Sequence, residues 1–188
     1  KVTGVQTCAL PISDYYGVAD WVDRTQNLRF GKGGIYVRSN GNNFSYGSLD
    51  CGPGNNGLIS CDQGSFESTE AIPYLITVAA LRVDGIKTSY STTGAGTWVS
   101  GFGGEYGYDA GLGWNVAGLK WEDPAMMTAD RSTCSVGYVR SGTGDTPRNP
   151  FQNGDSPHPE NPECKYSSTF NGTSSAAPTV AGSVAMIL

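Results

Sequence analysis

Residues 170 to 182 read Phe170-Asn171-Gly172-Thr173-Ser174-Ser175-Ala176-Ala177-Pro178-Thr179-Val180-Ala181-Gly182, and this stretch decides the fold. Gly172 permits a tight turn in front of a helix, because glycine adopts backbone angles that other residues avoid. Ser174 then falls in the first turn of that helix, where free backbone N–H groups and the helix dipole favour negative charge. An acyl-transfer transition state needs this kind of stabilisation beside its nucleophile. The alternative interpretation is an ordinary Ser/Thr-capped helix with a packing face of small residues.

The helix continues with small or apolar residues on nearly every face: Ala176, Ala177, Val180, Ala181, Val184, Ala185 and Ile187. A helix of this kind is expected in the middle of a fold. It reaches Leu188 without a cap, a terminal glycine or a closing turn. Because helices normally signal their end, we expect the sequence to be truncated there.

Two apolar runs upstream predict buried strands. Ile35-Tyr36-Val37 leads directly into a Ser/Asn/Gly segment, and residues 74 to 81 show no polar alternation. Strands of this type are buried on both faces, as in a parallel sheet covered by helices. Shorter strands are expected near residues 89 to 91 and 97 to 100, and residues 101 to 168 are expected to be mostly loop.

An amphipathic helix is predicted to precede the first strand. Apolar residues recur at roughly helical spacing from Asp14 onward, at Tyr15, Val18, Ala19, Val22 and Leu28. The glycine-rich residues 31 to 34 end the pattern.

Composition indicates a single, loop-rich secreted domain. The 188 residues include 27 glycines, and only 15% of positions are charged. The formal net charge is −5 and no run of Lys or Arg occurs, so we expect neither nucleic acid nor a membrane as a partner. No apolar stretch is long enough to cross a bilayer.

The chain has five cysteines, an odd number that needs an explanation in a secreted protein. Residues 2 to 12 resemble the conceptual translation of a sequencing-library adapter, so we expect residues 1 to 13 to be non-native, with few contacts and no partner for Cys8. A native strand or leader is the alternative. The other four cysteines allow three connectivities, of which we favour Cys51–Cys61 with Cys134–Cys164. Two bridges imply an oxidising location, extracellular or periplasmic.

The stretch around Ser174 resembles the nucleophile motif of subtilisin-like serine proteases, Gly-Thr-Ser-x-Ala-x-Pro followed by a small-residue helix. The length of the match favours this interpretation over an ordinary capped helix. The resemblance implies a three-layer α/β fold with a mainly parallel sheet, truncated at both ends, of which residues 14 to 188 are the C-terminal portion. It also implies a serine endopeptidase that cleaves polypeptides through an acyl-enzyme on Ser174, with no cofactor needed for the chemistry.

A second part of the resemblance lies at the end of the first predicted strand. In the family this strand ends in Gly-Asn, and the Asn side chain donates a hydrogen bond to the oxyanion. Carried over, Asn42 takes this role. Ser39, Asn40 and Gly41 would then line one wall of the pocket for the substrate side chain that precedes the scissile bond.

Further segments resemble the kexin and furin branch and its bacterial relatives, namely residues 33 to 37, 72 to 74, 89 to 92, 98 to 100 and 103 to 107. In that branch, acidic residues after the Gly-Asn segment recognise basic substrate residues and help to hold calcium. The candidates here are Asp50, Asp62 and Glu67, with ordinary solvated loop acids as the alternative. A calcium-binding Glu of the family corresponds to Thr92, so calcium stays an open structural option and the metal ligands are unassigned. Gly101-Phe102 also replaces the usual Ala-Pro.

The family's catalytic His and Asp lie in His-Gly-Thr and Asp-Ser/Thr-Gly segments upstream of the Gly-Asn strand, and neither occurs here. The only histidine, His158, is flanked by prolines and lies downstream, so we expect a surface residue and not the base. A secreted pseudoenzyme or binding module with the same fold is the main alternative. A disulfide-bonded β-rich lectin-type domain fits the composition but leaves the Ser174 motif unexplained. The sequons at Asn43 and Asn171 are expected to be unmodified, because a glycan on Asn171 would crowd the nucleophile.

Overall fold

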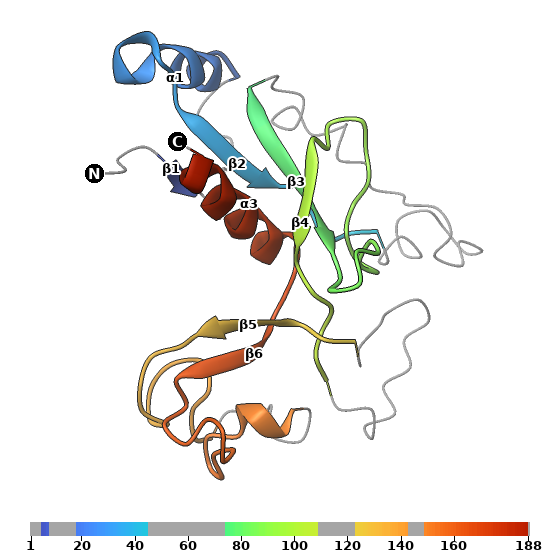
Figure 1. Cartoon of the computed structure of the whole chain (residues 1–188), viewed down its shortest axis with the longest axis vertical. Coiled ribbons are helices and arrows are strands. Elements are labelled where there is room, and N and C mark those ends of the chain that lie inside the picture. Colours follow the sequence, from blue (N-terminus) through green and yellow to red (C-terminus); the bar gives the residue numbers. More distant parts are fainter. Residues whose placement is uncertain (1–4, 8–17, 45–73, 109–122, 143–148, 188) are drawn as a thin grey trace, which may run out of the picture.

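The computed structural model describes residues 5–7, 18–44, 74–108, 123–142 and 149–187 (Figure 1). The elements follow in the order β1 (Val5–Thr7), α1 (Val18–Gly31), β2 (Ile35–Ser39), β3 (Leu75–Leu81), β4 (Val99–Phe102), β5 (Met126–Ala129), η3 (Pro150–Gln152), β6 (Tyr166–Phe170) and α3 (Thr173–Ile187). Strands β1 to β4 form one parallel sheet in that order, while β5 and β6 form a separate antiparallel pair. The predicted α/β class with a parallel sheet is confirmed.

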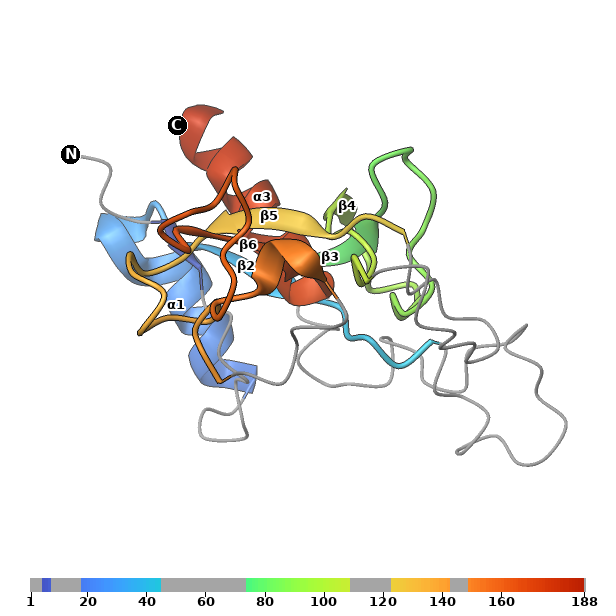
Figure 2. The same ribbon diagram turned by 90° about the horizontal axis from the view of Figure 1, so that it is seen from below.

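Helix α3 lies across one face of the parallel sheet, and α1 lies at the end where β2 and β3 begin (Figures 1 and 2). On one face α3 packs its alanines against apolar sheet residues, the cluster being Val37, Val78, Ala80, Tyr90, Ala176, Ala177 and Ala181. On the other face Val22 of α1 packs against Tyr36 and Leu75. Because successive strand residues point to opposite faces, Val37 packs in the cluster with α3 and its neighbour Tyr36 packs against Val22 of α1. This is the three-layer arrangement that the sequence predicts.

Close packing of α3 on β4 depends on small residues. A side chain at Gly101 would bring its Cβ within 2.7 Å of the Ala176 carbonyl oxygen. The first part of α3 is accordingly buried, whereas Met186 and Ile187 at its end are more than four-fifths exposed. The expectation of a helix buried throughout is therefore wrong for its last turn. No described helix is long and apolar enough to pass through a bilayer.

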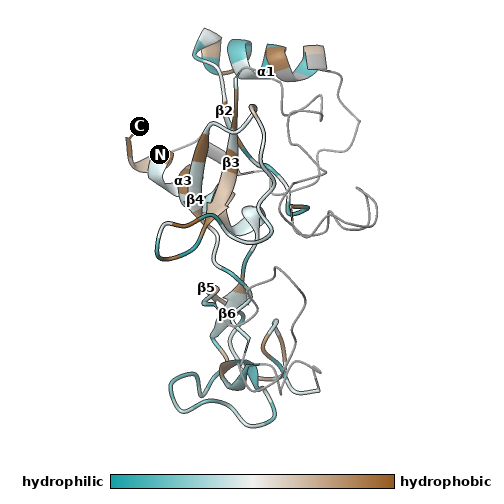
Figure 3. Ribbon diagram, turned by 90° about the vertical axis from the view of Figure 1, so that its right-hand side faces the viewer, coloured by the Kyte–Doolittle hydropathy of each residue, from teal (hydrophilic) through white to brown (hydrophobic). Residues whose placement is uncertain are grey.

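The β5–β6 pair belongs to a second, mainly hydrophilic lobe. This lobe lies beyond the N-terminal end of α3 (Figures 1 and 3). Apart from the last two residues of β6 it lies within residues 101 to 168, and most of the described residues there are loop, as the sequence predicts. The short Met126–Ala129 and Tyr166–Phe170 runs carry β-forming residues but no clear alternation. Their pairing across a long connection is a tertiary feature, and this explains why the pattern missed it.

Two other predictions need correction. Residues 89 to 91 do not form a strand, because their hydrogen bonds go to Glu105, Ala80 and other separate partners instead of one ladder. Helical geometry in α1 also ends before Leu28, whose ψ is 157°. The carbonyl of Leu28 instead accepts a hydrogen bond from the Gly33 nitrogen at 2.8 Å, which turns the chain toward β2.

The N-terminal segment contacts the sheet more than we expected. Residues Val5–Thr7 form β1, which pairs in parallel with β2 from Ile35 to Val37. The expectation of few contacts is therefore wrong for these three residues. Pairing at a sheet edge uses backbone groups, so an extended segment with β-forming residues can pair there whatever its origin. Cys8 lies outside the described residues, and the non-native origin of residues 1 to 13 stays a prediction.

Candidate active site

Ser174 lies exposed in the first turn of α3, as the sequence predicts. The preceding Gly172 has a φ of +96°, a conformation that favours glycine. Its carbonyl oxygen accepts hydrogen bonds from Ser175 N at 3.0 Å and Ala176 N at 3.2 Å, which closes the first turn. The N–H of Ser174 itself has no acceptor within the part of the chain that the structure describes, so it is available to a ligand.

Asn42 lies directly beside this turn. Its Oδ1 atom accepts hydrogen bonds from Thr173 N at 2.8 Å and from Thr173 Oγ1 at 2.9 Å. With Oδ1 held in this way, the Nδ2 group of the same amide is oriented, and it donates to no acceptor among the described residues. The structure therefore brings Asn42 and the Ser174 turn together across 131 positions of sequence.

Gly172 leaves open the space between these two donors. A Cβ atom built on it would lie 3.4 Å from Asn42 Nδ2, 3.6 Å from Asn42 Oδ1 and 3.6 Å from Ser174 N. The Asn42 amide and the Ser174 nitrogen thus border one small space that a side chain at position 172 would fill. Two N–H donors bordering one space beside a serine are the kind of group that can bind an oxyanion, which is the chemistry that a tetrahedral acyl intermediate requires.

A loop after β3 fixes the segment that carries Asn42. The Gly41 carbonyl accepts a hydrogen bond from Thr92 N at 3.0 Å, and Asn43 N donates to Thr92 Oγ1 at 3.1 Å. Gly41 has a φ of +96°, which turns the chain sharply as it leaves β2. Asn42 is therefore held by backbone bonds on both sides, so its amide has a defined position.

Asn40, predicted as part of the substrate pocket, is almost fully buried at 2% exposure. Its Nδ2 donates to the Thr92 carbonyl and to Thr97 Oγ1, and its Oδ1 accepts from Ser91 Oγ. The side chain thus ties β2 to residues 91 to 97. Ser39 is half-buried and Gly41 offers only backbone, so contact of Ser39, Asn40 and Gly41 with a substrate stays a prediction.

Tyr90 also reaches this site, and sequence reasoning assigned it no role. Its hydroxyl accepts a hydrogen bond from Gly172 N at 2.8 Å, and the side chain is buried. Burial raises the pKa of Tyr90 to about 12. The two residues lie 82 positions apart, and only their proximity in the fold reveals the contact.

A cavity of about 310 Å³ adjoins the nucleophile turn on the side of the β5–β6 lobe. It is lined by Thr128, Ala129, Asp130, Tyr138, Ser167, Thr169, Phe170 and Asn171. Asn171, which lines it, directly precedes Gly172 in the chain. The size is at the lower end of the range typical of ligand pockets.

His158 lies between η3 and β6, in the lobe that contains the β5–β6 pair. Its ring contacts Phe151 with a centroid separation of 5.4 Å, and its Nδ1 accepts a hydrogen bond from Glu160 N at 3.3 Å. Neither of these contacts joins it to Ser174. Among the described residues, therefore, Ser174 has no histidine as a hydrogen-bond partner.

The remaining sequence-predicted acids and cysteines cannot be placed. Asp50, Asp62, Glu67, Cys51 and Cys61 all lie outside the described residues. Among the residues that are described, no three His, Cys, Asp or Glu side chains gather as a metal site would require.

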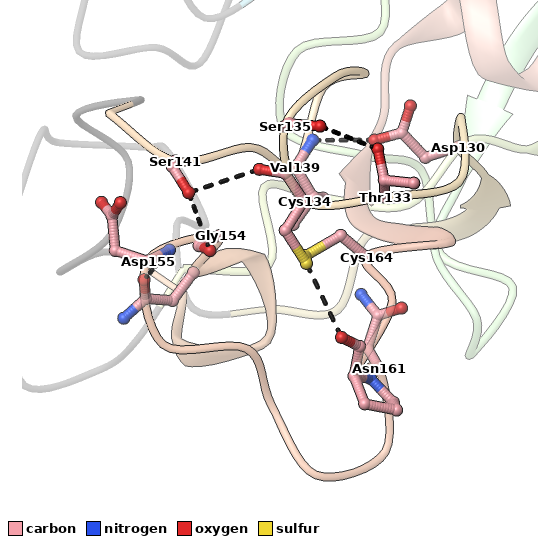
Figure 4. Close-up of a disulfide and its surroundings, with 12 residues drawn as sticks. Asp130, Thr133, Cys134, Ser135, Val139, Ser141, Gly154, Asp155, Asn161 and Cys164 are labelled. Carbon is pink, nitrogen blue, oxygen red and sulfur yellow. Dashed lines mark hydrogen bonds between the residues drawn. A yellow bond between two sulfur atoms is a disulfide. The ribbon is translucent and has the colours of Figure 1, made fainter.

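The predicted Cys134–Cys164 disulfide is confirmed (Figure 4). It joins the loop after β5 to the residues before β6. In the same loop, burial alone would raise the pKa of Asp130, but hydrogen bonds from the backbone N–H groups of Val139, Tyr138 and Arg131 hold it below its usual value. The disulfide and this carboxylate together organise one wall of the cavity.

Replacing both cysteines with serine is expected to destabilise this lobe by about 3 to 4 kcal/mol, because the bridge closes a loop of 30 residues and limits the unfolded chain. Urea unfolding of the double variant, compared with the wild type in the presence and absence of reductant, measures the effect. Equal midpoints for oxidised wild type and variant would contradict the prediction.

Comparison with known proteins relates the chain to secreted serine proteases. An extracellular serine protease of Aeromonas sobria is 30% identical to the chain over 161 residues, which are 84% of this chain and 23% of the relative. The chain is homologous to the Aeromonas serine proteases. A microbial serine proteinase of Aeromonas salmonicida is 34% identical over 116 residues, covering 60% of this chain and 15% of the relative. No protein-family model matches.

The crystal structure of the Aeromonas sobria serine protease supports the same homology at the level of fold. Its TM-score to this serine-protease homologue is 0.66 at 27% identity, covering 90% of this chain and 26% of that chain. The chain therefore spans about a quarter or less of the length of the relatives it matches. The resemblance to subtilisin-like serine proteases that the sequence predicts is confirmed.

Proposed function

We propose that the protein carrying this segment is a serine endopeptidase in which Ser174 is the nucleophile and Asn42 an oxyanion donor. The observation that carries the proposal is that Asn42 Nδ2 and Ser174 N both border the open space beside Gly172. Homology to serine proteases supports the reaction class. A pseudoenzyme or binding module would have no use for two free donors beside an exposed serine.

The reaction would begin with attack of Ser174 Oγ on a peptide carbonyl carbon, while the hydroxyl proton passes to a general base. The carbonyl oxygen becomes negative and accepts hydrogen bonds from Asn42 Nδ2 and Ser174 N. Collapse breaks the C–N bond, the amine leaves with the proton, and water then hydrolyses the acyl-enzyme. We propose that the base and its orienting carboxylate come from residues outside these 188, because the one histidine of the chain is engaged elsewhere.

The proposed substrate is a polypeptide, and the adjoining cavity offers room for one of its side chains. Cleavage after basic residues, with Asp62 and Glu67 as recognition residues, is proposed from the resemblance alone. A cleavage profile dominated by large apolar residues would count against it. Extracellular or periplasmic location is supported by the disulfide and by the extracellular relative.

Asn42 variants of the full-length protein test the proposal. Asn42→Asp keeps an oxygen for Thr173 but removes the Nδ2 donors, and Asn42→Ala removes both. We expect each to lower kcat by about 100- to 1000-fold with a smaller change in KM, because the lost bond forms fully only in the transition state. Steady-state hydrolysis of a fluorogenic peptide measures both constants.

Asn43→Ala is the matched control. This neighbouring asparagine has an exposed side chain, so its loss is expected to change kcat by less than about twofold. Equal kcat values for Asn42→Asp and the wild type would refute the oxyanion role of Asn42.

A further inference from the structure

The turn that presents Ser174 is hydrogen-bonded to the side chain of a buried tyrosine. We propose that Tyr90 is a positioning residue, whose hydroxyl fixes the Gly172 peptide so that Ser174 Oγ and N–H face the substrate carbonyl. This inference rests on the proposed function and assigns a role to a residue that touches no substrate. It is carried by the hydrogen bond from Gly172 N to Tyr90 Oη at 2.8 Å.

The Tyr90 hydroxyl both accepts and donates hydrogen bonds. It accepts from Gly172 N, and its own proton is directed at the carbonyl oxygens of Gly103, at 3.1 Å, and Gly104. The ring packs edge-on against Tyr106 with a centroid separation of 5.8 Å. Because burial raises the pKa of Tyr90 to about 12, the hydroxyl keeps its proton through the neutral pH range.

The backbone N–H and carbonyl of Gly172 and the N–H of Thr173 each have a specific partner. The Gly172 N–H bonds Tyr90, its carbonyl accepts from the α3 backbone, and the next N–H, that of Thr173, bonds Asn42. A Cβ on Gly103 would approach the Gly172 oxygen to 2.8 Å, so the backbones lie close on that side as well. Tyr90 thus fixes the peptide unit between residues 171 and 172, and Asn42 fixes the next unit, between residues 172 and 173.

Tyr90 is in turn held by the residues on either side of it. Ser89 N and Ser89 Oγ donate to the two carboxylate oxygens of Glu105 at 2.7 and 2.8 Å, and Ser91 Oγ accepts from Ala80 N at 3.0 Å. Glu105 has no exposed surface and follows directly after Gly103-Gly104, whose carbonyl oxygens accept the hydrogen bond from the Tyr90 hydroxyl. The segment that supplies Tyr90 and the segment that accepts its hydrogen bond are therefore joined through one carboxylate.

Tyr90→Phe in the full-length protein removes only the hydroxyl and tests the proposal. We expect kcat to fall by about 10- to 100-fold with KM nearly unchanged, because a displacement of about 1 Å at the reacting atoms can cost a hundredfold. Deuterium exchange at the Gly172 amide should become at least about tenfold faster, since its acceptor is gone. Unchanged kcat, or an unchanged exchange rate at Gly172, would overturn the inference.

Asn161→Ala is the control for simple destabilisation. Asn161 is buried and bonds both the N–H and the carbonyl of Tyr166 in the second lobe, without contacting Gly172. We expect it to lower the melting temperature without changing kcat, and a loss of kcat as large as that of Tyr90→Phe would refute a specific role. If the wild-type protein has no peptidase activity, the proposed function fails, while exchange at Gly172 still decides whether Tyr90 holds the turn.

Discussion

Ser174→Ala in the full-length protein is expected to lower kcat by about a millionfold, the loss typical of removing the nucleophile of a serine protease of this type. The hydroxyl is the only group in the first turn of α3 that is both nucleophilic and exposed, and it lies next to the space bordered by Asn42 Nδ2 and Ser174 N. Hydrolysis of a fluorogenic peptide gives the rate. Failure of the variant to react with a fluorophosphonate identifies the serine independently.

The adjacent serine provides a matched control. Ser175 is fully buried, and its Oγ has no hydrogen-bond partner among the described residues. Ser175→Ala removes an unsatisfied polar atom without leaving a large cavity, so its effect on folding is expected to be neutral or stabilising and kcat is expected to stay within about twofold. An inactive Ser175→Ala protein together with an active Ser174→Ala protein would show that the nucleophile is Ser175 and not Ser174.

The 188-residue chain by itself is expected to hydrolyse peptides at a rate about a millionfold below that of the full-length protein. A neutral serine hydroxyl is a weak nucleophile without a base within hydrogen-bond distance, and removing triad members leaves only residual oxyanion and binding effects. The ring of His158, the only histidine, instead contacts Phe151 and accepts a bond from Glu160 N. Parallel assays of the purified chain and the full-length protein test this.

His158→Ala in the full-length protein is the control, and its kcat is expected to match the wild type. Peptidase activity of the isolated chain that is abolished by Ser174→Ala would contradict the prediction. His158 would then have to be the base, in a chain order different from the one that the resemblance implies.

The sequence by itself determined the features that depend on local pattern. Residues 35 to 37 and 74 to 81 lack polar alternation, and parallel strands formed over Ile35–Ser39 and Leu75–Leu81, with Tyr74 left exposed outside the strand. Gly172 before a run of small residues placed Ser174 in the first turn of a helix packed on the sheet. These outcomes follow from turn geometry and from the periodicity of apolar residues, which neighbouring positions encode.

Only the tertiary structure decided which distant residues complete the site. Asn42 reaches Thr173 across 131 positions, and Tyr90 reaches Gly172 across 82. Asn40, which the resemblance placed in a substrate pocket, turns inward and bonds Thr92 and Thr97. The sequence names such residues but does not show their partners, because a hydrogen bond between two loops depends on how strands and helices pack and not on any local period.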